Sequence, residues 1–241
     1  MRRYFLAILS VLLIGCESVK IKKEHGQLPK QEEKSYSVSF GQEEILATDM
    51  SFDVKTGEIK YTLPQEAIVR IRIGLRDGGP LLLALLDWEI RSAGPHVEVW
   101  DKRDRTGQVI FGERGDYMVV VSCKPISAQG KKGVRKSPDL RITFPESHEA
   151  TAEGTPILKG TSPVRIILPE EEKKWFNETK YELGIYIDTV FLMEDEEGTD
   201  PFTYQLNTEN FSEGVHTLTI NLVGYEGEVG TKSVLIFVKN H

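Results

Sequence analysis

The chain of 241 residues carries 37 acidic and 30 basic side chains, for a formal net charge of −7. A net acidic chain is a poor ligand for nucleic acid and is not attracted to an anionic membrane surface, so neither partner is expected on electrostatic grounds. The length suits two domains of about 100 residues each. Only two cysteines are present, Cys16 and Cys123, so the fold must depend on packing rather than on a disulfide framework.

The first segment has the composition of an export signal. Arg2-Arg3 precedes an apolar run over residues 4–14, which is long enough for a signal-peptide core and too short to span a bilayer. The run ends in Leu13-Ile14-Gly15-Cys16, which resembles the lipobox of bacterial lipoproteins. This resemblance implies that residues 1–15 are a signal peptide cut between Gly15 and Cys16, and that acyl chains such as palmitate on Cys16 anchor the protein. The alternative is an ordinary signal peptide followed by a chance cysteine.

The residues that follow Cys16 indicate the membrane to which the protein is sorted and how its first domain is attached. Glu17 is not the aspartate that is associated with inner-membrane retention in lipoproteins. The resemblance therefore implies the outer membrane where the cell has one, and otherwise the outer face of the cell membrane. Residues 16–43 are rich in Lys, Glu, Gln and Ser, which predicts a flexible tether between the lipid and the first domain.

The next region shows the two-residue period of β-strands. Thr56-Gly57 is typical of a hairpin turn, and Val69, Ile71 and Ile73 alternate with Arg70 and Arg72. We expect the arginines to form a solvated face, with anion binding as the alternative. The run 81–86 predicts a strand buried on both sides. Cys123 ends another alternating run, which predicts a half-buried strand thiol rather than a reactive one.

The same region resembles a known family. Its pattern is Gly94-Pro95-His96, then Trp100 to Gly107 (WDKRDRTG), then Gly115-Asp116-Tyr117. This order is similar to the immunoglobulin-like domain of the flagellar hook-capping protein and covers residues 44–125. The resemblance implies a small antiparallel β-sandwich and no flagellar function. Lys102 stands where that family has glycine, which leaves the backbone at this turn open.

A second domain is expected after a linker. Residues 126–139 hold basic residues, Gly and Pro, which predicts a solvated linker. Residues 140–241 contain several strand patterns and one helix candidate, Glu170–Phe176. This half resembles bacterial Ig-like domains through Ile185-Tyr186-Ile187-Asp188 and Asp200-Pro201-Phe202-Thr203-Tyr204. The fold class expected for the whole chain is all-β, with two tandem Ig-like antiparallel β-sandwiches.

Several residues are candidates for interaction sites. Asp101 and Asp104 favour turn capping over calcium binding, because their spacing does not match a loop of alternating oxygen ligands. Glu194 and Asp195 belong to an acidic cluster that is typical of a charged hairpin tip, with weak calcium binding as the alternative.

Two rival functions depend on other side chains. Trp88 and Trp175 are the aromatic rings that a glycan-binding groove would use. His96 and His216 are the residues around which an enzyme site between the domains would be built, although satisfied strand-end histidines are the simpler interpretation.

No motif for a catalytic or cofactor site is present. The sequence lacks a phosphate-binding Gly-rich loop, a nucleophile elbow and the His or Cys spacings of metal and haem sites. We therefore expect a non-catalytic, membrane-anchored envelope lipoprotein without cofactor or metal, whose Ig-like domains act as spacer and protein-interaction modules. Its partner would be another envelope protein or a surface glycan. A carbohydrate-binding module is the alternative function, and an enzyme with an inter-domain site is a further one.

Overall fold

The computed structural model describes residues 45–126, 134–144 and 149–240. Gly15, Cys16 and the expected tether over residues 16–43 lie outside these ranges. The described chain is all-β apart from one α-helix and one short 3₁₀ turn, and the predicted fold class is confirmed. Within the described ranges, no helix is long and apolar enough to cross a bilayer.

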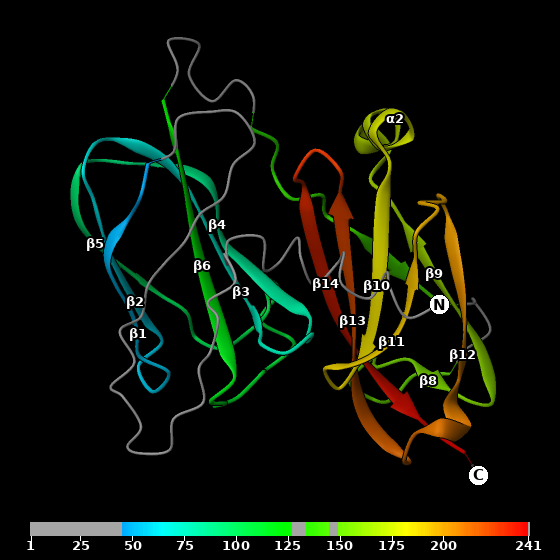
Figure 1. The fold of residues 1–241 in the computed structure, drawn as a ribbon. Coiled ribbons are helices and arrows are strands. Elements are labelled where there is room, and N and C mark those ends of the chain that lie inside the picture. Colours follow the sequence, from blue (N-terminus) through cyan, green and yellow to red (C-terminus); the bar gives the residue numbers. More distant parts are fainter. Residues whose placement is uncertain (1–44, 127–133, 145–148, 241) are drawn as a thin grey trace, which may run out of the picture.

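The first domain is a sandwich of two three-stranded sheets (Figure 1). One sheet has the order β1-β2-β5 and the other β4-β3-β6, and all of these pairs are antiparallel. The strands are β1 (Thr48–Phe52), β2 (Glu58–Leu63), β3 (Ala67–Leu75), β4 (Leu81–Arg91), β5 (Gly94–Val99) and β6 (Tyr117–Pro125). Their alternating apolar residues meet in one core, which also contains the buried rings of Trp100 and Tyr117.

The second domain has a five-stranded sheet, β11-β10-β13-β14-β8, facing a three-stranded sheet, β12-β9-β7. Its pairs are antiparallel except for β14 with β8. The elements are β7 (Arg141–Thr143), β8 (Ile157–Leu158), β9 (Thr161–Ile167), α2 (Glu170–Thr179), β10 (Tyr181–Ile187), β11 (Val190–Asp195), β12 (Phe202–Asn207), η1 (Thr208–Asn210), β13 (Gly214–Gly224) and β14 (Val229–Val238). A separate core fills this sandwich.

Two local expectations can be compared with the observed elements. The strand predicted over residues 81–86 is β4, and its first four residues are buried. The helix starts at Glu170 as predicted but continues to Thr179, three residues beyond the expected end. It stops where Lys180 adopts φ 69°, a left-handed conformation that cannot continue a right-handed helix.

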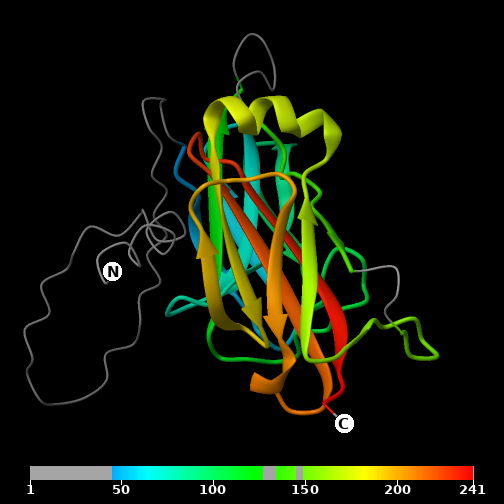
Figure 2. The same cartoon turned by 90° about the vertical axis from the view of Figure 1, so that its right-hand side faces the viewer.

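The two sandwiches pack side by side, with β3 and β4 of the first domain against the hairpin of β13 and β14 in the second (Figures 1 and 2). The hairpin's inward residues, such as Leu218 and Ile220, belong to its own core. Its outward residues Thr219, Asn221 and Ser233 are also buried, although polar alternation is typical of a solvated face. We call the region where the two domains meet the domain interface.

Candidate functional site

A pair of hydrogen bonds at the domain interface joins Asn221 on β13 to Leu81 at the start of β4. The Leu81 N–H donates to the Asn221 side-chain oxygen at 2.7 Å, and the Asn221 amide nitrogen donates to the Leu81 carbonyl at 2.8 Å. The Thr231 hydroxyl donates to the same carbonyl at 2.8 Å. Because β4 is an edge strand, these side chains satisfy backbone groups that a neighbouring strand would otherwise bond.

Arg70 lies in the same interface, on the face of β3 opposite the core. Only 6% of its surface is exposed, so the expectation of a solvated arginine face is wrong for this residue. Its Nη2 donates to the carbonyl of Gly227, in the turn between β13 and β14, at 3.2 Å. Burial, together with the charge of Arg72 beside it, lowers the pKa of Arg70 to about 9, which still leaves the guanidinium charged at neutral pH.

Trp88 is not an exposed ring available to a glycan. It lies within β4, is buried, and is covered by the Arg70 guanidinium at 4.3 Å and the Lys124 ammonium at 4.8 Å from the ring centre. Trp88 is therefore wrong as a candidate interaction residue, because it lies in a strand and its ring is covered by side chains of β3 and β6. Nothing in the strand's own pattern indicates a second domain that packs there.

Trp175, on α2, is half-buried and also covered by a cation. The Arg135 guanidinium lies 4.4 Å from its ring centre, and the indole N–H donates to Glu228 at 2.7 Å. Arg135 also forms an ion pair with Glu172 on the same helix. One face of this ring is therefore unavailable for stacking on a sugar, and Trp175 instead helps to fix the β13–β14 turn against α2.

The described part of the linker binds both domains. Ser137 donates from its backbone N–H to Asp87 on β4 at 2.6 Å, and Lys136 forms an ion pair with Glu89 at 2.9 Å. Arg135 reaches the second domain through Glu172 and Trp175. The expectation of a solvated linker is wrong for Arg135 and Ser137, which are half-buried, whereas Lys136 is exposed although it forms an ion pair.

Asp101 and Asp104 are both used by the loop that contains them. The Arg103 N–H donates to Asp101 at 3.0 Å, whereas Asp104 accepts from the Val109 N–H at 3.0 Å and from the Thr106 hydroxyl at 2.6 Å. These contacts are the turn capping that the sequence favours. Lys102 adopts φ 63°, so lysine here occupies the left-handed conformation that glycine would adopt without strain.

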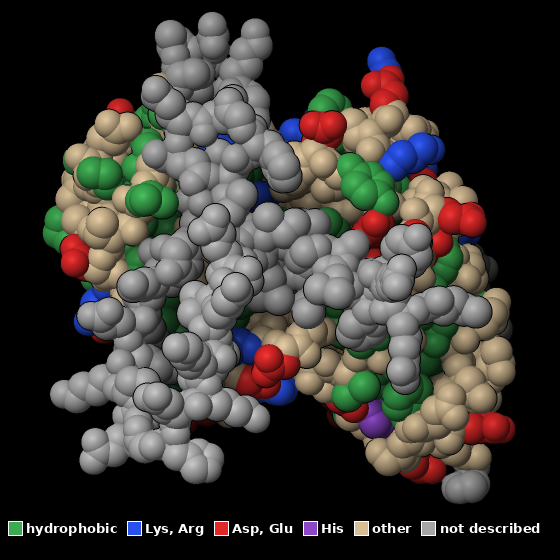
Figure 3. All heavy atoms as spheres, viewed as in Figure 1, with side chains coloured by type: hydrophobic (Ala, Val, Ile, Leu, Met, Phe, Trp, Pro, Cys, Tyr) green, Lys and Arg blue, Asp and Glu red, His purple; other side chains and the backbone are tan. Residues whose placement is uncertain are grey.

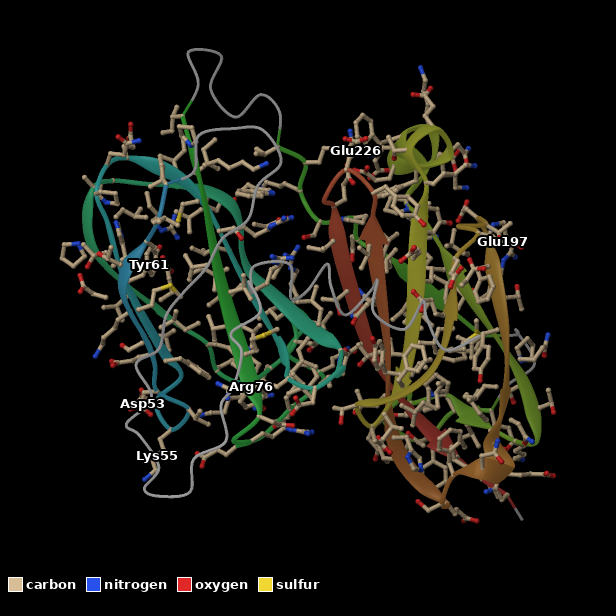
Figure 4. The ribbon with its side chains drawn as sticks, in the orientation of Figure 1. Asp53, Lys55, Tyr61, Arg76, Glu197 and Glu226 are labelled. Atoms are coloured by element: carbon tan, nitrogen blue, oxygen red, sulfur yellow. The ribbon has the colours of Figure 1, made fainter. Side chains whose placement is uncertain are left out.

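The two candidate residues of the acidic cluster near the end of β11, Asp195 and Glu194, differ in their surroundings. Asp195 accepts from the Gly198 N–H at 3.2 Å, within a loop that also holds the exposed Glu197 (Figure 4). This loop joins β11 of the five-stranded sheet to β12 of the three-stranded sheet, so the expectation of a hairpin tip is wrong. Glu194 is half-buried near Glu182, which accepts from the Tyr225 hydroxyl at 2.6 Å. Burial, then the charges of Glu182 and Glu196, raise the pKa of Glu194 to about 7.

His96 and His216 are bonded within their own domains. Each is the third residue of a strand, and each Nε2 lies 2.8 Å from the carbonyl four residues earlier, which explains the similar sequence around them. The half-buried His96 ring stacks on that of Tyr61, which is itself buried in the first core (Figure 4). His216 Nδ1 lies 2.5 Å from Asp188. No group of three or more His, Cys, Asp or Glu that could hold a metal ion occurs in the part of the chain that the structure describes.

Cys123 is buried on β6 within the first core, where burial raises the pKa of its thiol to about 11. A thiol with a raised pKa is a poor nucleophile at neutral pH, because only the thiolate reacts. The predicted half-buried strand thiol is therefore fully buried.

Comparisons with known proteins add little to this geometry. No protein-family model and no curated protein matches the chain. It is similar to fibronectin(III)-like modules of Clostridium thermocellum CbhA, with 13% identity over 81% of this chain and 94% of that chain, at a TM-score of 0.30. It is also similar to a putative membrane anchored protein of Corynebacterium diphtheriae, with 13% identity over 82% and 53% at 0.29, and to an endo-beta-1,4-mannanase of Thermotoga petrophila, with 15% identity over 62% and 30% at 0.30. Likenesses at these scores assign no function, and the sandwich architecture rests on the observed strand pairing.

Proposed function

We propose that the protein is a lipid-anchored envelope protein whose two docked β-sandwiches present a rigid interaction surface to a protein partner. The observation that carries this proposal is the order of a basic start, a short apolar run and Gly15-Cys16 at the N-terminus. Acylation of Cys16 would supply the attachment that an acidic chain cannot obtain from charge.

The docking of the domains supports an interaction role. Side-by-side packing makes a broad block, whereas an end-to-end arrangement would make an extended spacer (Figure 1). Burial of polar side chains at the domain interface, such as Asn221, favours one fixed arrangement over free hinging. Confinement by lipid would then raise the local concentration of this surface toward its partner.

The sheet β1-β2-β5 offers a surface suited to a protein. On its edge strand β5, Val97 and Val99 are 54% and 61% exposed, beside the charged side chains of Glu58 and Lys60 on β2. Hydrophobic side chains appear on this outer side of the first domain, away from the second (Figure 3). An apolar stripe with a charged border is typical of protein contacts.

The glycan-binding alternative depends on open aromatic faces. Trp88 is buried and Trp175 has one face covered by Arg135, so the described residues favour a protein partner over a sugar. An enzyme site between the domains would need His96 and His216 to act as a pair. Each of them is instead bonded to groups of its own domain, which does not favour the enzyme alternative.

The anchor is tested by replacing Cys16 with serine and following membrane fractionation and metabolic labelling with a palmitate analogue. We expect Cys16→Ser to lose the label and leave the membrane fraction. Cys123→Ser is the matched control and should keep both. Retention of Cys16→Ser in the membrane fraction would refute the lipid anchor.

The interaction surface is tested in intact cells with a photocrosslinking residue placed at position 97 or, as a control, at exposed position 215 on the second domain. A defined protein adduct at position 97 that is absent at 215 supports the proposal. Equal labelling at both positions, or none, argues against this face.

A further inference from the structure

The row of cations on the outer face of β3 and β6 has more hydrogen-bond donors than acceptors. Arg70 Nε and Nη1, and Arg72 Nε, are buried and have no hydrogen-bond partner. The single acceptor for the Arg70 guanidinium among the described residues is the Gly227 carbonyl. A buried N–H group without an acceptor is costly, and more so when the group is charged.

Lys124 adds a third positive charge to this row. It lies on β6 over the ring of Trp88, from which Arg70 is also less than 5 Å away. Burial, together with the charge of Arg70, lowers the pKa of Lys124. Two like charges over one ring in a partly buried region repel each other, and a bound anion offsets that repulsion.

The neighbouring carboxylates do not balance these charges. Asp87 accepts from the backbone N–H and the hydroxyl of Ser137. Glu228 accepts from the Trp175 indole through one oxygen, and its other oxygen is buried without a partner. Within the described ranges, neither carboxylate forms an ion pair with Arg70 or Arg72, although both lower the electrostatic cost of the Arg70 charge.

The unpaired donors indicate the chemistry of the missing acceptor. They belong to two separate guanidinium groups on the same face of one strand, so the acceptor needs several oxygens that point in different directions. A tetrahedral oxyanion has four oxygens, whereas a carboxylate has two in one plane. Arginine forks bind phosphate oxygens with charge-assisted hydrogen bonds that are about twice as strong as neutral ones.

We propose that Arg70, Arg72 and Lys124 bind a tetrahedral oxyanion of the phosphate class at the domain interface. The anion accepts from the unpaired guanidinium N–H groups and neutralises the cation row. Because Arg70 also contacts the β13–β14 turn through Gly227, the bound anion strengthens the docking of the two domains. This site is independent of the lipid anchor and of the surface on β5.

The test uses the full-length chain purified in detergent, with inorganic phosphate as the probe and sodium chloride at equal ionic strength as the reference. We expect saturable heat in titration calorimetry and a saturable rise in unfolding temperature with phosphate. Sodium acetate should bind at least tenfold more weakly. Equal responses to phosphate and chloride would overturn the site, and equal binding of acetate would overturn its assignment to a tetrahedral anion.

Single substitutions test whether phosphate binds at Arg70, Arg72 and Lys124. Arg72→Gln, at a half-buried position that tolerates the change better than Arg70, should weaken phosphate binding at least tenfold. Arg76→Gln is the matched control, since Arg76 is exposed just beyond the end of β3 (Figure 4). Glu228→Gln should tighten binding severalfold, because it removes a competing negative charge. Unchanged binding by Arg72→Gln, in a protein whose unfolding transition remains cooperative, would refute the proposal.

Discussion

Replacing Asn221 with alanine is expected to loosen the domain interface without disturbing the second core. The side chain of Asn221 is 2% exposed and makes three hydrogen bonds, two with the backbone of Leu81 and one with the Thr231 hydroxyl at 2.9 Å. Its neighbours on β13 that fill the core, Ile220 and Leu222, point to the opposite face.

The magnitude follows from these contacts. A typical intramolecular hydrogen bond contributes about 0.5–1.5 kcal/mol net, and a buried donor without an acceptor costs about 1–3 kcal/mol. In Asn221→Ala the Leu81 N–H loses its acceptor, whereas the Leu81 carbonyl keeps the Thr231 hydroxyl. We therefore expect a loss of about 3 kcal/mol, assigned to the docking of the domains.

Scanning calorimetry measures this effect. The wild-type domains should unfold together, and Asn221→Ala should separate the unfolding into two transitions. Val215→Ala is the control, because Val215 lies on the same face of β13 but is 60% exposed. A destabilisation below about 1 kcal/mol, or one equal to that of the control, would refute the role of Asn221.

Three further predictions concern single residues. Gly57→Ala should destabilise the first domain by about 3 kcal/mol or more in urea unfolding, because its Cβ would lie 1.9 Å from the Trp100 carbonyl oxygen at φ 76°. Gly107→Ala, with φ 75° and open space, should cost only about 1 kcal/mol, and similar losses would contradict the clash. Glu194→Gln should raise the unfolding temperature at pH 8 but not near pH 4. Folding raises the pKa of Glu194 from its ordinary value of 4.5 to about 7, so the stability of the wild-type protein falls as the pH rises from 4.5 to 7. The neutral glutamine does not lose a proton and escapes this loss. Glu197→Gln should show no such dependence. The Cys123 thiol should resist a maleimide at pH 8 in the native protein and react on unfolding, so prompt native labelling would argue against its burial.

The local elements of this chain follow from short-range patterns. Alternation of Val69, Ile71 and Ile73 with polar residues predicts β3, and the apolar run from Leu81 predicts β4. The roles of Asp101 and Asp104 as turn caps are also readable, because an Asp side chain bonds backbone groups a few residues away. Lys102 is less obvious: its left-handed φ is imposed by the surrounding loop, whose capping bonds hold the turn around it.

The burial of outward-facing polar side chains could not be predicted from the strand patterns, because it depends on contact with the other domain. Alternation assigns one face of a strand to its own core and is silent on what covers the other, so the sequence predicts a solvated face for Arg70 and an open ring for Trp88. The contacts between the domains join residues 140 and 157 positions apart, as in Asn221 with Leu81 and Arg70 with Gly227. No local pattern encodes such a pairing.

The sequence by itself determined the all-β class and most strands, since each depends on residues close together in the chain. Only the tertiary structure decided that the sandwiches lie side by side and that charged and amide side chains are enclosed between them. The physical reason is that burial depends on all the surfaces that folding brings together, and Arg70 is covered in part by the second domain, through Gly227.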